Sequence, residues 1–145
     1  MDHASDETKK VGEALAWIVG VLERHGVPYQ VVGGLAARAH GAERPIVDVD
    51  LYVPFDQAQS ALEEIRPNVV WGPQHHAGDE WDLTFLKADH GGQRVDYDAG
   101  VRVELLGVRA WVMPEEELVR YKRILGRPVD LDDVAQIAKR RRVGE

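Results

Sequence analysis

Hydrophobic residues near the N-terminus repeat at the spacing of an α-helix. Apolar side chains recur every three or four positions from Val11 to Leu22, and the pattern stops at Gly26. Polar residues, among them Asp6, precede it, as is usual at the start of a helix. The pattern therefore predicts an amphipathic helix from Asp6 to His25.

The next apolar run is short and ends in a pair of glycines. The segment Tyr29–Val32 favours a strand, Gly33 and Gly34 follow at once, and residues 35–39 have the composition of a short helix. We therefore expect the glycine pair at a turn between a strand and a helix.

The clearest alternation of apolar and polar positions lies at residues 46–53. Apolar side chains alternate there with Asp48 and Asp50, and Pro54 closes the run. Because successive side chains of a strand point to opposite faces, this segment predicts a strand with both carboxylates on one face.

The remaining segments continue the succession of helices and strands. Their patterns predict a helix over 56–65, strands over 81–87 and 94–98 joined as a hairpin at Gly91-Gly92, strands over 101–103 and 108–112, a helix that opens at Pro114 and ends at Gly126, and a last helix capped by Asp130.

Length and composition bound the class of protein. With 145 residues, 44% of them hydrophobic, the chain has the size of one domain. No apolar run is long enough to span a membrane and the N-terminus is polar, so we expect a cytoplasmic protein with no membrane partner. Cysteine is absent, so any bound metal must be held by oxygen or imidazole ligands.

The charge of the chain argues against one class of partner. The formal net charge is −7, which repels the phosphate backbone, so we do not expect a long nucleic acid as substrate. A basic cluster at residues 139–142 is read as a helix C-terminus matched to the helix dipole.

The glycine pair and the two aspartates together suggest phosphate chemistry. Two carboxylates on one face of a strand suit Mg²⁺, which binds through one or two protein carboxylates, waters and substrate phosphates. Backbone N–H groups at Gly33-Gly34 could approach phosphates closely, because no Cβ stands in the way. Each signal alone has an ordinary alternative, a solvated strand face for the aspartates and a plain turn for the glycines.

The order of these signals resembles a known superfamily. The stretch VVGGLAARAHGAERPIVDVDLYV is similar to the signature of the DNA-polymerase-β-like nucleotidyltransferases, and MPEEELVRYKRILGRPVDLDDVAQI to the ending of small bacterial members. These include abortive-infection, toxin-antitoxin and lincosamide- or aminoglycoside-modifying proteins. The resemblance implies an α/β (α+β) nucleotidyltransferase fold with a mixed twisted sheet flanked by helices. It would form a single domain over residues 1–145, with its core at about 27–113 and C-terminal helices at 114–142.

The resemblance also implies roles for individual residues. Gly33 and Gly34 would position a nucleoside triphosphate, while Asp48 and Asp50 would coordinate Mg²⁺ or Mn²⁺ and act in catalysis. A third carboxylate is expected on a later strand as metal ligand and general base. Asp96 is preferred for this role because Val95 and Tyr97 would face the core on either side of it, and Asp98 is the alternate.

Three cations complete the implied site. Lys122, and less surely Arg127, match positions that reach phosphates or close the site in relatives, and Arg44 is a further phosphate-binding candidate. Lys122 and Arg127 have an ordinary alternative as part of a solvated helix face.

The expected activity is the metal-dependent transfer of a nucleoside monophosphate to an acceptor hydroxyl with release of pyrophosphate. The acceptor would be a small molecule or a protein. Only two helices follow the sheet, so the acceptor would bind in the cleft, on a second subunit of a homodimer or on a partner protein. The alternative is a catalytically inactive binding module of this fold, such as an antitoxin-type partner. In a departure from the family pattern, Pro45 stands where many relatives carry threonine or serine.

Overall fold

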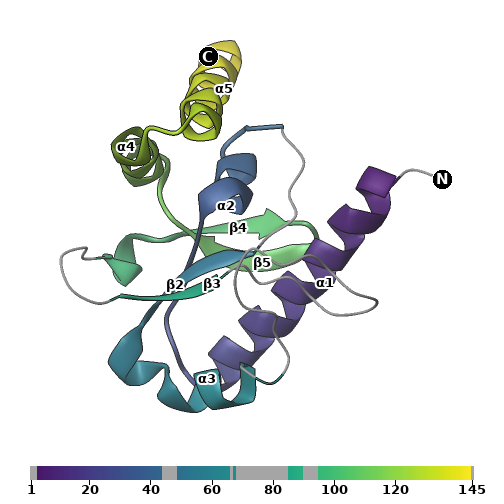
Figure 1. The fold of residues 1–145 in the computed structure, drawn as a ribbon, viewed down its shortest axis with the longest axis vertical. Coiled ribbons are helices and arrows are strands. Elements are labelled where there is room, and N and C mark those ends of the chain that lie inside the picture. Colours follow the sequence, from purple (N-terminus) through teal and green to yellow (C-terminus); the bar gives the residue numbers. More distant parts are fainter. Residues whose placement is uncertain (1–2, 44–48, 66, 68–84, 90–94, 145) are drawn as a thin grey trace.

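The computed structural model describes residues 3–43, 49–65, 67, 85–89 and 95–144 (Figure 1). In this part of the chain, a mixed β-sheet is combined with α-helices, which confirms the predicted mixed α/β class. The helices are α1 (His3–Arg24), α2 (Gly33–Ala39), α3 (Gln59–Ile65), α4 (Glu115–Leu125) and α5 (Pro128–Gly144). The strands are β1 (Gln30–Val32), β2 (Asp50–Pro54), β3 (Phe85–Asp89), β4 (Val101–Leu105) and β5 (Val108–Val112). Two 3-10 turns are η1 (Phe55–Gln57) and η3 (Tyr97–Ala99).

The central strand of the sheet is β1. The strand order is β3-β2-β1-β5-β4, with β1 antiparallel to β2 and parallel to β5. All residues of β1 are buried, as expected for a strand that has neighbours on both sides. Its register with β2 sets Val32 opposite Asp50 and Gln30 opposite Tyr52. Directly opposed residues share a sheet face, so Gln30, Asp50 and Tyr52 project to the same side.

The helices divide between the two ends of the molecule. Helices α2, α4 and α5 gather at one end, and α3 lies at the other beside the C-terminal part of α1 (Figure 1). The predicted helix over 6–25 is confirmed as α1, whose apolar residues Leu15, Ile18 and Leu22 are fully buried. None of the described helices is both long and apolar enough to cross a membrane.

The predicted strands over 101–103 and 108–112 are confirmed as β4 and β5, which pair as an antiparallel hairpin. Their two-residue turn has positive φ at both positions, 51° at Leu106 and 81° at Gly107. Positive φ at both central residues is the conformation that matches the right-handed twist of two paired strands. The sequence predicts the two strands but not the positive φ of Leu106, because leucine rarely adopts this conformation.

The predicted strand over 94–98 is wrong for its described part. Val95 and Asp96 lie in a loop, and Tyr97 begins η3. The Asp96 carboxylate accepts a hydrogen bond from the backbone N–H of Asp98, a local bond that competes with strand pairing. The expected hairpin partner, β3, pairs in parallel with β2 instead. The predicted start at residues 81–84 and the turn Gly91-Gly92 lie outside the described residues.

The C-terminal helices agree with their start and stop signals, with one correction. Helix α4 follows Pro114 and ends at Gly126, which adopts the left-handed conformation with φ 62°. Helix α5 begins at Pro128, a residue suited to the first helical position because it needs no N–H partner. Asp130 therefore lies inside the first turn of α5. The prediction that Asp130 caps this helix is wrong.

Candidate functional site

The glycine turn and the aspartate strand meet at one end of β1. Gly33 is the first residue of α2 and has φ 65°, a backbone conformation that favours glycine. A Cβ at this position would lie 2.6 Å from Oδ2 of Asp50 and 3.3 Å from its Cβ and Cγ. Two features therefore favour glycine at position 33: the positive φ of the backbone and the close approach of the Asp50 carboxylate.

Only part of the expected site lies within the described residues. Gly34 is the second residue of α2 and is half-buried. Asp48 and Arg44 lie outside the described residues, so the expected pairing of Asp48 with Asp50 is neither confirmed nor contradicted. Within the described ranges, no three carboxylate or imidazole side chains come together as a metal-binding group.

Asp96 lies on the same side of the sheet as Asp50 but not on a strand. The side chain of Gln30, which is fully buried, donates a hydrogen bond of 2.8 Å to the carbonyl oxygen of Asp96. Gln30 precedes Val32, the partner of Asp50, by two residues on the same face of β1. The carboxylate of Asp96 is exposed and caps η3, and Asp98 is exposed beside it. Val95 and Tyr97 are partly buried against the core.

Lys122 differs most from its expected role. It lies on α4, where it is only 1% exposed, and its Nζ atom is 3.2 Å from Oδ1 of Asp130 and 2.9 Å from Oδ2 of Asp133. Both aspartates are fully buried on α5. The ammonium group is therefore enclosed between two helices rather than presented to solvent. Breaking such a pair leaves an uncompensated buried charge, so we expect loss of Lys122 to destabilise the packing of α4 against α5.

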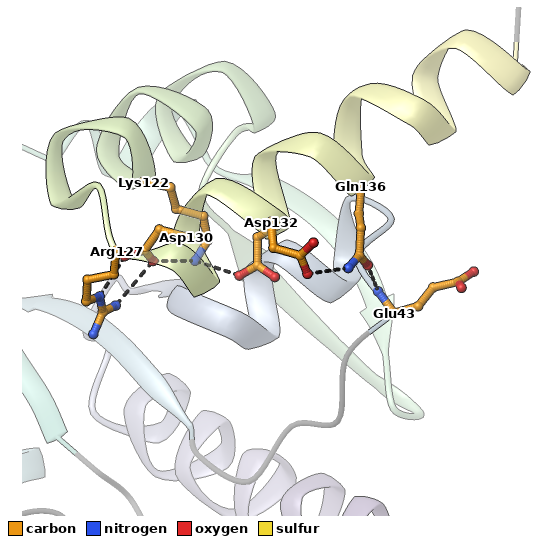
Figure 2. A network of polar contacts seen from close by, with 7 residues as sticks. Glu43, Lys122, Arg127, Asp130, Asp132 and Gln136 are labelled. Atoms are coloured by element: carbon orange, nitrogen blue, oxygen red, sulfur yellow. Dashed lines mark hydrogen bonds and ion pairs between the residues drawn. The ribbon is translucent and has the colours of Figure 1, made fainter.

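Arg127 follows α4 and lies at the surface beside this buried cluster (Figure 2). Its Nε and Nη2 atoms donate hydrogen bonds of 2.6 and 3.2 Å to the two oxygens of Asp130. This hydrogen bond is the main cause that raises the pKa of Arg127 above its ordinary value, while burial acts in the opposite direction. The charge of Asp50 raises it further, so Arg127 and Asp50 lie within electrostatic reach of each other.

The carboxyl group of Asp130 is held in its charged form. Burial by itself raises the pKa of this group, but hydrogen bonds from Arg127 and Lys122, with their charges, outweigh burial and lower the pKa below its ordinary value. Asp130 therefore bridges a buried cation and an exposed one.

Helix α4 contacts the sheet face that carries Asp50 through one aromatic pair. The ring of Tyr121 packs edge-on against the ring of Tyr52, with 6.2 Å between their centroids. Tyr52 projects to the same face as Asp50, because the two residues are two positions apart on β2. This contact therefore joins α4, the helix that precedes Arg127, to the sheet face of Asp50.

Helix α5 also holds the chain segment that leads toward Asp48. The side-chain oxygen of Gln136 accepts a 2.7 Å hydrogen bond from the backbone N–H of Glu43, and its amide group donates one of the same length to Asp132. Figure 2 shows Arg127 at one end of this polar network and Glu43 at the other. Sequence reasoning missed Gln136, although the i, i+4 spacing of Asp132 and Gln136 was a usable signal.

Comparison of the sequence with models of known protein families gives no match, and comparison with curated proteins gives none either.

Proposed function

We propose that this chain is a metal-dependent nucleotidyltransferase with the nucleotidyltransferase fold. It would transfer a nucleoside monophosphate from a nucleoside triphosphate to an acceptor hydroxyl. A bond forms between the acceptor oxygen and the α-phosphorus, the bond to the bridging oxygen breaks, and pyrophosphate leaves. The hydroxyl proton passes to a carboxylate, for which Asp96 is the first candidate and Asp98 the second.

One observation carries this proposal. The Asp50 carboxylate lies so close to Gly33 that a side chain at position 33 would collide with it. The glycine turn is therefore next to the acidic residue at the start of β2. A backbone turn without side chains can receive phosphate oxygens, and the adjoining carboxylate suits Mg²⁺ or Mn²⁺. Asp50, with Asp48 and Asp96, would hold the ion, which when bound neutralises charge on the phosphates.

Among the cations, the buried position of Lys122 favours Arg127 as the group that contacts phosphate. The side chain of Arg127 is 64% exposed, whereas the ammonium of Lys122 is enclosed by Asp130 and Asp133. Gly34 and Arg44 remain candidates for the same triphosphate.

A second candidate function is a binding module of the same fold without catalysis, such as an antitoxin-type partner. Two observations support this second candidate. Asp96 is used to cap its own turn rather than standing on a strand beside Asp50, and Lys122 does not reach solvent. A homodimer or a partner protein would then be the functional assembly.

Calorimetric titration of the protein with ATP and Mg²⁺ tests the first proposal. The wild type should release or take up heat with a saturable isotherm, and the Asp48→Asn, Asp50→Asn double variant should not. Asp56→Asn, an exposed carboxylate in η1, is the matched control and should bind as the wild type does. Identical isotherms for the wild type and the double variant would count against nucleotide binding at this site.

A transfer assay separates the two candidate functions. The protein is incubated with a cell lysate and each of the four α-labelled triphosphates in turn. A labelled acceptor identifies both donor and acceptor class and supports the enzyme. Triphosphate binding without any labelled product, in the presence of Mg²⁺ or Mn²⁺, supports the binding module.

A further inference from the structure

We propose that Asp130 is a positioning residue that holds the Arg127 guanidinium so that its remaining N–H groups face the triphosphate, while Asp133 is a second counter-ion of Lys122. This inference rests on the proposed function and assigns separate duties to two aspartates that otherwise look alike.

The geometry of Arg127 leaves donors for a ligand. A guanidinium group carries five N–H donors in a rigid plane, and the two bonds to Asp130 use one on Nε and one on Nη2. In the described part of the chain, Nη1 makes no hydrogen bond or ion pair. Three donors therefore remain, two of them side by side on the edge between Nη1 and Nη2, and that edge is suited to two oxygens of a phosphate.

Asp130 can orient the Arg127 guanidinium because its own side chain is held in place. It is fully buried, Lys122 fixes one of its oxygens, and both oxygens are bonded to Arg127. Such a bidentate contact removes most of the rotational freedom of a long, exposed side chain before any ligand arrives. Prior ordering of this kind lowers the entropy lost on binding.

The direction of the held group agrees with the glycine turn. The edge-on contact of Tyr121 with Tyr52 joins α4 to the sheet face that also carries Asp50. The influence of the Asp50 charge on the pKa of Arg127 agrees with this placement. An anionic ligand bound through a cation at Asp50 would therefore lie between Asp50 and the exposed edge of Arg127.

Asp133 offers a matched comparison on the same helix. It is buried as fully as Asp130, contacts the same ammonium group, and lies three residues along α5. Its Oδ2 atom lies 2.9 Å from the Nζ atom of Lys122, and among the described residues the Arg127 guanidinium bonds to Asp130 rather than to Asp133. Asparagine at either position removes one buried charge beside Lys122, so the two variants should lose similar stability.

The test is calorimetric titration of wild type, Asp130→Asn, Asp133→Asn and Arg127→Ala with MgATP. We expect Asp130→Asn and Arg127→Ala each to raise Kd by about tenfold, which corresponds to the loss of one charge-assisted contact of about 1.4 kcal/mol. Asp133→Asn should stay within about twofold of the wild type despite a similar loss of thermal stability. The double variant Asp130→Asn, Arg127→Ala should bind no more weakly than Arg127→Ala alone, because the two changes act through one group.

The outcomes separate the inference from the function beneath it. Equal weakening by Asp130→Asn and Asp133→Asn, or unchanged binding by Arg127→Ala, would overturn the positioning role while leaving nucleotide binding intact. Arg127 is exposed, so its alanine variant remains informative even if an aspartate variant fails to fold. A wild type that does not bind MgATP would overturn the proposed function itself.

Discussion

Replacing Gly33 with alanine tests the contact on which the candidate site depends. The new methyl group would lie 2.6 Å from Oδ2 of Asp50, well inside van der Waals contact, and 3.3 Å from Cβ and Cγ. The Asp50 carboxylate must therefore turn away from the glycine turn. At the same time, the backbone at φ 65° becomes strained for any residue with a side chain.

The magnitude follows from these two contributions. Left-handed backbone in a residue with a Cβ costs about 1–2 kcal/mol. Displacing the Asp50 side chain adds about 1–3 kcal/mol, the usual cost of overpacking. Gly33→Ala should thus lose roughly 2–5 kcal/mol of unfolding free energy, and it should weaken MgATP binding because Asp50 has moved.

Gly26→Ala is the matched control. Gly26 has nearly the same backbone conformation, φ 67°, but nothing lies within 4 Å of its would-be Cβ. It should show the backbone cost alone, about 1–2 kcal/mol, with MgATP binding unchanged. Urea unfolding and calorimetry measure both quantities. If the two alanine variants lost equal stability and bound MgATP equally well, the contact between Gly33 and Asp50 would have no consequence and the reasoning would be refuted.

Three further predictions concern the interior and the edges of the fold. Lys122→Met should cost about 3–5 kcal/mol in urea unfolding, because it leaves buried carboxylates uncompensated, whereas Arg123→Met on the exposed face should cost less than about 0.5 kcal/mol. The pKa of Asp130 is lowered in the folded state, so its contribution is present above the unfolded pKa of about 3.9 and is lost as the pH falls further. The stability difference between wild type and Asp130→Asn should accordingly persist from about pH 7 to 5 and shrink toward about pH 3. Tyr29→Phe should cost about 1 kcal/mol in thermal unfolding, since the Tyr29 hydroxyl accepts a hydrogen bond from the backbone N–H of Trp111.

Much of the fold was predictable because its signals are local. The helical repeat of α1, the strand-to-helix turn at Gly33 and the stop at Gly126 each depend on residues within a few positions of one another. The strand predicted over 94–98 is wrong because another local signal, a hydrogen bond between near neighbours, is present there. Its alternating pattern was real, and Val95 and Tyr97 do pack against the core, but the bond between Asp96 and Asp98 outweighed strand pairing.

The candidate site was less predictable, since it depends on contacts between distant segments. Lys122 reads as a cation on a helix face, and only the docking of α5 shows that Asp130 and Asp133 enclose it. The i, i+3 spacing of these aspartates indicates one helix face but not what that face meets. The hydrogen bond from Gln30 to the Asp96 carbonyl joins residues 66 positions apart, which no local pattern can reveal.

The enclosure of Lys122 between α4 and α5 has a consequence for protein engineering. The buried charge on α4 is compensated by two aspartates on α5. The two helices can therefore be exchanged between related proteins only together. A chimaera that joined α4 of this chain to a foreign α5 lacking both aspartates would bury a lone ammonium group and fold poorly. The boundary between Met113 and Pro114, which precedes both helices, is therefore the place for a crossover.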